Sequence, residues 1–359
     1  MLIIITNTIK PYCYDIEPVI GLPNNLSHRF RYRSRWIKLP YSIESTKLRE
    51  GIVVLRDYSS AELIPIRRVI IEDVLSFGDI HYIELRLNEF IPNSLEVGLA
   101  ALIQAKIVEF GYKNLSNNHL EKLIFEVDFK YDSPEKDLGG GEKWALLTKR
   151  LGSLECYKDF SFLKILSIND SKGSPANIVR GAIGRYCYSL KPNNLYFANV
   201  IQSITSNIEE DESIENPYDI ELKAESDEIW VLRGIQRVVG KYDLLRFIIK
   251  TPISKKNKYT FLELQKKQPI GGLTYELPAL FLPVNILVPT IKKIIMWMRG
   301  SISVLSLASL ICSGIIAKQF NWDVNIFRTF ATVVLVLAIG KYDEFAGAFI
   351  KETKNARLD

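Results

Sequence analysis

The segment from His28 to Lys38 alternates cationic residues with mostly aromatic ones, and its residue types suit the binding of an anion. On a β-strand successive side chains point to opposite faces, so arginines at every second position would form a ladder with a repeat of about 6.8 Å. Guanidinium groups bind phosphate or carboxylate through two parallel hydrogen bonds. The pattern predicts a site for an anionic small ligand or an acidic protein partner at Arg29, Arg31, Arg33 and Arg35, with Phe30, Tyr32 and Trp36 packing inward.

A competing interpretation of the same segment is structural. An exposed strand at the edge of a sheet is protected from aggregation by like charges, and four arginines would serve that purpose. A second basic group lies between residues 229 and 247 and contains Arg233, Arg237, Lys241 and Arg246. We include Arg233 and Arg237 as candidate ligand-binding residues that could share a pocket with the first group. The alternative is that the two groups occupy separate solvated faces.

Catalytic motifs give weaker signals. The glycine-rich segment 139–143 lacks the following Lys-Ser/Thr of a phosphate-binding loop and is interpreted as a flexible turn. Ser161 and Lys164 match the spacing of a serine nucleophile with a lysine base, but the alternating apolar residues around them favour a strand. The three histidines lie outside known catalytic motifs. We therefore predict no catalytic residue, no metal site and no cofactor, and a hydrolase with an unrecognised site remains an alternative.

The elements expected to position these residues are mainly β-strands. Residues 49–90 contain three segments rich in β-branched residues and separated by turn formers, and several similar segments follow between 123 and 252. Between them, apolar residues recur at steps of three and four, which predicts a helix at 94–111. The expected fold class is mainly β (α+β), with two small barrel-like or sandwich-like domains at 1–112 and 113–270.

The C-terminal part has a different composition. Residues 271–300 are expected to form a basic neck and an interfacial amphipathic helix, and residues 301–359 a two-helix transmembrane hairpin with a tail. Residues 301–317 carry no charge, a length at the lower limit for a membrane-crossing helix. A second apolar stretch ends at Gly340 and contains Arg328, which would have to extend toward the far interface, face the partner helix or line a water-filled path. The alternative is that these helices form the core of a soluble helical domain.

Charge and cysteine distribution predict the location. Cationic residues flank both apolar stretches, at Lys292, Lys293 and Arg299 before the first and at Lys341, Lys351, Lys354 and Arg357 after the second. The positive-inside rule then places the N-terminal head and the C-terminus in the cytoplasm, with the chain crossing the inner membrane of the cell more than once. The four cysteines are widely separated, as expected of reduced cytosolic thiols.

These features predict a membrane-anchored, signal-responsive protein. Its β-rich head would bind an anionic ligand or partner and thereby control how hairpins from several copies assemble in the lipid bilayer. This layout resembles that of prokaryotic antiviral effectors that join a cytosolic sensor to a few membrane helices. The resemblance is in layout only and includes no diagnostic motif. A passive membrane tether or scaffold is the alternative. A nucleic acid partner is less favoured because the net charge is only +5.

Overall fold

The computed structural model divides the chain into two compact units, an N-terminal unit of Met1–Leu287 and a C-terminal unit of Val288–Asp359. The N-terminal unit is described at residues 1–9, 14–111, 122–129, 140–157, 160–181, 184–204, 218–226, 229–238, 242–252, 257–270, 273–276 and 280–287. The C-terminal unit is described at 304–305, 307–308, 310–312, 315, 318–319, 323–326, 328–329 and 331–333. The prediction of a mainly β fold with few helices is confirmed for this described part.

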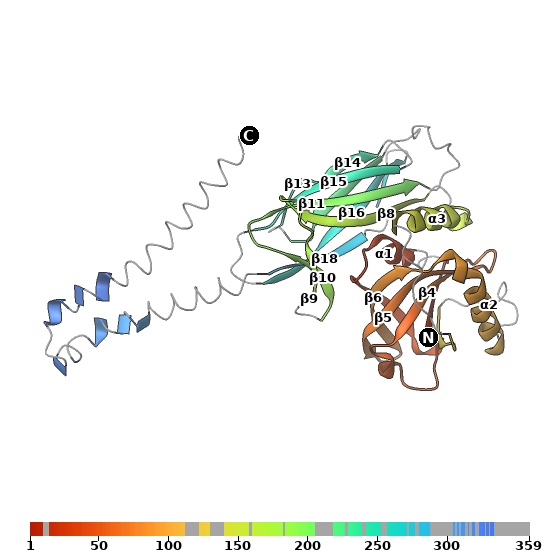
Figure 1. Ribbon diagram of the computed structural model, residues 1–359, viewed down its shortest axis with the longest axis horizontal. Helices are drawn as coiled ribbons and strands as arrows, with labels where there is room; N and C mark the ends of the chain where they lie inside the picture. The colour runs from red at the N-terminus through yellow and green to blue at the C-terminus, as the bar shows by residue number, and fades with distance from the viewer. Residues whose placement is uncertain are drawn as a thin grey trace. The chain divides into compact units, whose positions relative to one another are not determined.

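The N-terminal half of the first unit forms one seven-stranded sheet, called here the first sheet (Figure 1). Its strands are β1 (Leu2–Asn7), β2 (Ser27–Arg33), β3 (Ile37–Lys38), β4 (Glu50–Arg56), β5 (Leu63–Phe77), β6 (Ile80–Phe90) and β7 (Leu123–Glu126). They lie in the order β2-β6-β5-β4-β1-β7-β3, which places β2 at one edge. Helix α2 (Asn93–Glu109), close to the predicted 94–111, packs Leu99, Ile103 and Ile107 against apolar side chains of β1 and β4.

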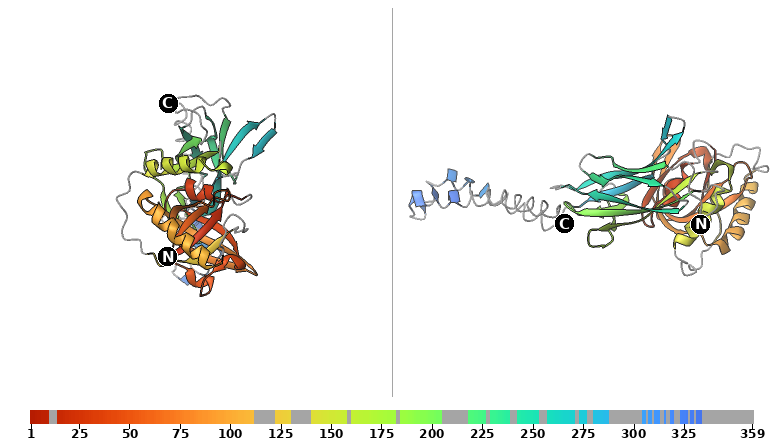
Figure 2. Two further views of the ribbon diagram at one scale, coloured as in Figure 1. Left: turned by 90° about the vertical axis from the view of Figure 1, so that its right-hand side faces the viewer. Right: turned by 90° about the horizontal axis from the view of Figure 1, so that it is seen from above.

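The remaining strands of this unit form two more sheets. The second sheet contains β9 (Asn177–Arg180), β10 (Tyr186–Leu190), β12 (Tyr218–Ala224), β14 (Ile235–Val238), β16 (Lys258–Ile270), β17 (Leu273–Glu276) and β18 (Leu280–Ile286). The third sheet contains β8 (Ser161–Asp170), β11 (Leu195–Ile204), β13 (Trp230–Arg233) and β15 (Tyr242–Lys250), in the order β13-β15-β11-β8. Helices α1 (Ile16–Gly21) and α3 (Gly140–Gly152) lie between these strands and the first sheet (Figures 1 and 2). The short 3-10 helices are Ser34–Trp36, Ile43–Thr46 and Glu155–Tyr157.

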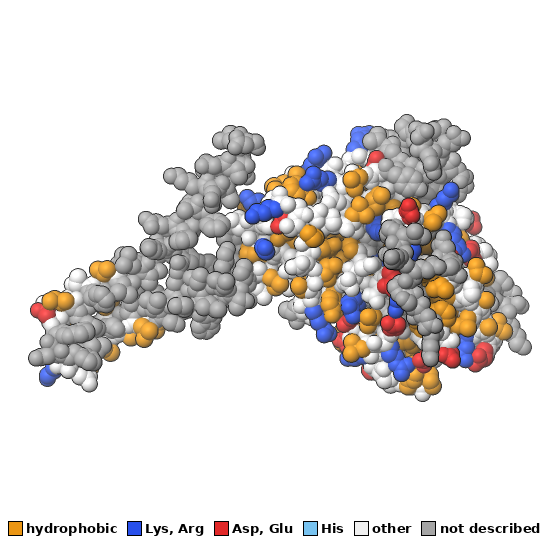
Figure 3. Space-filling view, in the orientation of Figure 1, with side chains coloured by type: hydrophobic (Ala, Val, Ile, Leu, Met, Phe, Trp, Pro, Cys, Tyr) orange, Lys and Arg blue, Asp and Glu red, His pale blue; other side chains and the backbone are white. Residues whose placement is uncertain are grey.

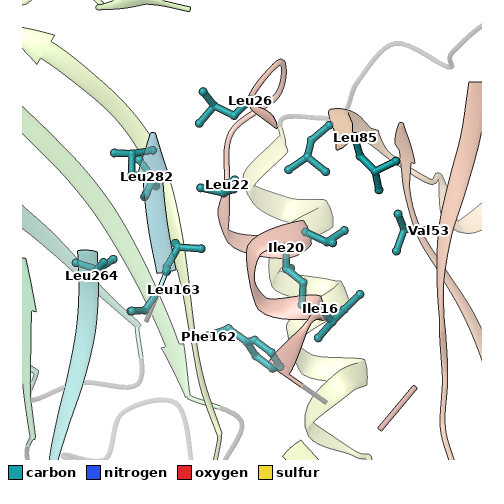
Figure 4. Packing of buried hydrophobic residues seen from close by; sticks show 14 of the residues in the cluster. Ile16, Ile20, Leu22, Leu26, Val53, Leu85, Phe162, Leu163, Leu264 and Leu282 are labelled. Atoms are coloured by element: carbon teal, nitrogen blue, oxygen red, sulfur yellow. The ribbon is translucent and has the colours of Figure 1, made fainter. Parts of the chain in front are cut away.

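Helix α1 joins the first sheet to the other two. Figure 4 shows Ile16 and Ile20 of this helix between Val53 and Leu85 on one side and Phe162 and Leu163 on the other. All six side chains are buried in a single hydrophobic core that extends through both halves of the unit. The helix also comes very close to β8, because a Cβ atom added at Gly21 would lie 2.4 Å from the carbonyl oxygen of Leu163.

Arg67 of β5 holds the C-terminal end of α1. Its Nη1 donates to the carbonyl oxygens of Val19 and Leu22 at 2.6 and 2.7 Å, and its Nη2 donates to Oδ1 of Asn24 at 2.6 Å. These carbonyl groups would otherwise lack partners at the helix end. Burial lowers the pKa of Arg67 to about 9, so the guanidinium is still charged at neutral pH.

A second buried contact ties α1 to the second sheet. The Nζ of Lys266, on β16, lies 3.6 Å from Oε1 of Glu17, and both side chains are almost completely buried. Burial raises the pKa of Glu17 and lowers that of Lys266, while their mutual attraction opposes both shifts. Removing one partner would leave an uncompensated buried charge, which is strongly destabilising.

The structure corrects two interpretations of individual segments. Strands β17 and β18 lie within the segment predicted to be a neck, and Leu280–Ile286 pairs with both β16 and β10. A buried central strand and a lipid-facing segment are both continuous apolar runs, which explains the error. The glycine-rich segment predicted to be a turn supplies the first residues of α3, whose Trp144 and Leu151 side chains are fully buried.

The first sheet also extends beyond the domain boundary expected at residue 112, because β7 pairs with β1. In the C-terminal unit, many of the described positions between 304 and 333 have helical backbone. Searched over the described positions alone, the structure contains no helix with both the length and the apolar character that a membrane crossing needs. The predicted hairpin at 301–359 falls largely outside those positions.

Candidate functional site

Strand β2 presents three arginines on one face. Arg29, Arg31 and Arg33 are exposed, whereas the intervening Phe30 and Tyr32 are 1% and 0% exposed. The alternation predicted for this segment is therefore present in the structure. We call Arg29, Arg31 and Arg33 the arginine face.

The alternation ends earlier than predicted. Ser34–Trp36 forms a 3-10 turn, so Arg35 does not continue the ladder, and its guanidinium lies 5.3 Å from the centre of the Trp36 ring. Trp36 is only partly buried. A strand rule of two residues per repeat fails here because the chain turns, which the regular spacing of the arginines does not reveal.

The arginine face lies at the edge of the first sheet, where β2 pairs only with β6 among the described strands. Part of the other edge of β2 is occupied by Lys122. Its Nζ donates to the carbonyl oxygen of Arg31 at 3.2 Å and to Oδ2 of Asp15 at 2.5 Å. The edge position agrees with the competing interpretation of an aggregation-protected strand as well as with a binding site.

Glu84 compensates one of the three charges. This residue of β6 lies opposite Arg29, and their Oε2 and Nε atoms are 2.8 Å apart. Its other oxygen lies 3.0 Å from Nε of Arg185, which comes from the turn before β10. Burial raises the pKa of Glu84, while Arg185 and Arg29 act in the opposite direction. Among the described residues, the side chains of Arg31 and Arg33 form no ion pair with an acidic residue.

Aromatic side chains adjoin the arginines. The guanidinium of Arg29 lies 5.9 Å from the ring centre of Tyr82, which contacts Phe77 edge to face at 6.0 Å. Phe77 is 64% exposed. Sequence reasoning did not single out Phe77 or Arg185 for this site. Strand pairing could have suggested Phe77, but no local pattern identifies Arg185, which lies about a hundred residues further along the chain, in the turn before β10.

The other candidate residues lie elsewhere. Arg233 is on β13 of the third sheet and Arg237 on β14 of the second sheet, both exposed, so they and the arginine face belong to three different sheets. Arg328 is exposed in the C-terminal unit, and its carbonyl oxygen accepts a hydrogen bond from Oγ1 of Thr332 at 2.8 Å. Lys241 lies outside the described residues.

Ser161 and Lys164, which have the spacing of a serine nucleophile and a lysine base, both lie on β8. Ser161 accepts a hydrogen bond from the Tyr218 hydroxyl at 2.5 Å, whereas Lys164, three positions further along β8, lies 5.2 Å from the ring centre of Phe90. Residues three apart on a strand point to opposite faces, so these two do not form a nucleophile and base pair. An open cavity of about 730 Å³ has a mixed lining that includes Lys38, Lys106 and Glu126. Within the described residues, no group of acidic, histidine or cysteine side chains could hold a metal ion.

No protein-family model matches this chain, and no curated protein matches it. One similar solved structure is a protein of unknown function from Porphyromonas gingivalis W83, at 10% identity over 35% of this chain and 47% of that chain, with a TM-score of 0.20. A family 123 glycoside hydrolase from Clostridium perfringens matches at 9% identity over 28% of this chain and 23% of that chain, with a TM-score of 0.19. The N-terminal domain of PorA matches at 11% identity over 34% and 94%, with a TM-score of 0.15. The match thus spans less than half of the first structure and less than a quarter of the second, and scores this low support no inference about fold or activity.

His28 lies beside the arginine face on the inner side of β2. Its ring packs edge to face on Phe30 at 4.8 Å, and its Nε2 atom is buried with no hydrogen-bond partner among the described residues. Burial, together with the positive charges of Lys122 and Arg185, lowers the pKa of His28 to about 3. The folded protein therefore keeps this imidazole neutral in mildly acidic solution.

This shift predicts acid sensitivity that depends on His28. Between pH 6.5 and 3 the unfolded chain binds a proton here and the folded chain does not, so stability falls as the pH falls, by about 1.4 kcal/mol per pH unit. Denaturant unfolding is measured at pH 7 and at pH 4.5. On acidification the free energy of unfolding of H28N should fall by about 2 to 3 kcal/mol less than that of wild type. An H28N variant as acid-sensitive as wild type would contradict this assignment.

Proposed function

We propose that this chain is a membrane-anchored, signal-responsive binding protein whose N-terminal unit recognises an anionic ligand or partner on the arginine face. The observation that carries the membrane part is the exposure of large apolar side chains in the C-terminal unit. Val304, Leu305, Leu307, Ile311 and Ile315 are between 53% and 77% exposed. Leaving this much apolar surface in water is unfavourable, and burial in lipid would remove the cost.

Residues 301–340 would form the transmembrane hairpin, with both flanks in the cytoplasm and the protein in the inner membrane of the cell. Arg328 would face a partner helix or a water-filled path, because a cation near the centre of a bilayer is costly. Homo-oligomers of such hairpins would provide the response, as in an antiviral-type membrane effector.

The binding part of the proposal rests on charge. Arg31 and Arg33 are exposed, point to the same side of β2 and are not engaged by an acidic side chain of the described residues. Each can therefore form charge-assisted hydrogen bonds with a phosphate or carboxylate group. A ligand with two anionic groups separated by about 6.8 Å would match the strand repeat.

A response requires more than binding. The ligand has to favour one arrangement of the hairpins over another, because a ligand with equal affinity for both arrangements does not change their populations. The edge position of β2 supports a second candidate, a passive tether that docks a partner by adding a strand to the first sheet. Strand addition relies on main-chain hydrogen bonds, whereas anion recognition relies on the guanidinium groups.

Membrane attachment should depend on the exposed apolar positions of the C-terminal unit. The double variant L307K/I311K should leave the membrane pellet after an alkaline carbonate wash, because each lysine at a helix centre costs about 2.5 to 3.5 kcal/mol on insertion scales. The control V97K/L146K changes two exposed apolar residues on helices of the N-terminal unit and should stay in the pellet. A wild-type chain released by carbonate, or a lysine variant retained as firmly as wild type, would argue against an inserted segment.

Anion binding should depend on Arg31 and Arg33. In calorimetric titrations of the detergent-solubilised full chain with sodium tripolyphosphate, R31E/R33E should weaken affinity about tenfold or more for each arginine. K149E/K172E alters two exposed lysines by the same net charge and should retain wild-type affinity. Equal weakening by both double variants would indicate a non-specific effect of net charge. Unchanged binding by R31E/R33E would exclude the arginine face as the site.

A further inference from the structure

The outer face of the third sheet is unusually apolar for a surface open to water. Register places Trp230 opposite Lys250 and Ile248 opposite Phe197, so these side chains share one face. Leu244 and Trp230 are 68% and 53% exposed, and Phe197 and Ile248 are partly exposed. In a sheet with one buried face, the other face is normally polar. We therefore expect a partner to cover this face.

Three cations lie among these apolar side chains. The guanidinium of Arg246 lies 4.0 Å from the ring centre of Phe197, and Nζ of Lys250 lies 5.7 Å from that of Trp230. Arg233 is paired in register with Ile248 and so joins the same face. Figure 3 shows hydrophobic and basic side chains side by side in the region of β11, β13 and β15. We call Phe197, Trp230, Arg233, Leu244, Arg246 and Lys250 the cationic-aromatic face.

Acidic side chains are missing from this face in the described part of the sheet. The residues that register brings onto it from β8 and β11 are Ser167, Asn169, Leu195, Phe197, Asn199 and Ile201, together with the buried Phe162, Lys164 and Ser203. Among its described residues, this face thus combines large apolar side chains, an exposed tryptophan and cations, without any acidic side chain. Interfacial membrane segments have the same composition, with aromatic and apolar groups at the boundary and cations among the headgroups.

We propose that the cationic-aromatic face docks on an anionic bilayer surface and thereby fixes how the N-terminal unit lies on the membrane. This inference rests on the proposed membrane attachment. The apolar run that begins at Ser301 follows soon after the end of the unit at Leu287, so the covalent chain keeps the sheet within reach of the bilayer that holds the run. Docking is then intramolecular, and even weak surface affinity populates the docked state.

Charge favours lipid over a second copy of this chain. A symmetric dimer would bring the same face of each copy together. Arg233, Arg246 and Lys250 would then face cations, with no carboxylate among the described residues of the face to compensate them. An anionic headgroup layer attracts each of these residues instead.

Tryptophan quenching in reconstituted vesicles tests the proposal. The full chain is placed in vesicles of phosphatidylcholine alone or of phosphatidylcholine mixed with phosphatidylglycerol. Both kinds of vesicle contain brominated acyl chains. The fluorescence of Trp230 is obtained by subtracting the fluorescence of W230F from that of wild type. Trp230 should be quenched in the anionic vesicles and much less in the neutral ones. R246Q/K250Q should lower the ratio of docked to undocked protein about fivefold for each charge removed. K149E/K172E should have no effect, and far-ultraviolet circular dichroism checks that all variants are folded.

The outcomes separate this proposal from the membrane anchor. A chain that resists carbonate extraction but whose Trp230 is equally unquenched in both vesicles would overturn docking and leave the anchor intact. A chain that carbonate releases would overturn the anchor, and added anionic vesicles that still quench Trp230 would then support docking alone. Concentration-dependent dimerisation in detergent that R246Q/K250Q abolishes, without anionic quenching, would assign the face to a second copy and contradict the proposal.

Discussion

Gly21 of α1 lies very close to the carbonyl oxygen of Leu163 on β8, so the third sheet packs directly on this helix. The same helix contacts β5 of the first sheet. A helix of six residues does not form on its own in water, so the surrounding structure has to hold α1 in place. Arg67 satisfies its terminal carbonyl groups from the first sheet, and Lys266 meets Glu17 from the second. Each of these contacts comes from a different sheet, which makes α1 the element on which the packing of the whole unit depends.

The same contacts set the start of the arginine face. Arg67 also donates to Asn24, and the backbone N–H of Asn25 donates to the carbonyl oxygen of Leu87 on β6, so the chain between α1 and β2 is fixed before the strand begins at Ser27. Arg185, in the turn before β10, then reaches Glu84.

Sequence reasoning recovered what local periodicity determines. The alternation at 28–33 and the helix near 94–111 follow from repeats of two and of 3.6 residues, which are properties of neighbouring residues. Helix α1 escaped prediction because six residues show no clear period. Leu280–Ile286 is interpreted from the sequence as part of a membrane-proximal neck, because a strand buried at every position except Phe281 has no polar face to reveal it. The link between Arg185 and Glu84 depends on sheet packing over a hundred residues of chain, and no spacing in the sequence encodes it.

The most direct test of this account is amide hydrogen exchange in the first sheet and the third sheet of the full chain, comparing wild type with G21A. If α1 joins the sheets, the added methyl group should displace β8 and lower the opening free energy of β1, β4, β8 and β11 together, by about 1 to 3 kcal/mol. G98A, in the exposed part of α2 where nothing lies near a new Cβ, should leave that energy unchanged or raise it by up to about 1 kcal/mol. Exchange in G21A equal to that of wild type, or accelerated in one sheet and unaltered in the other, would contradict the central role of α1.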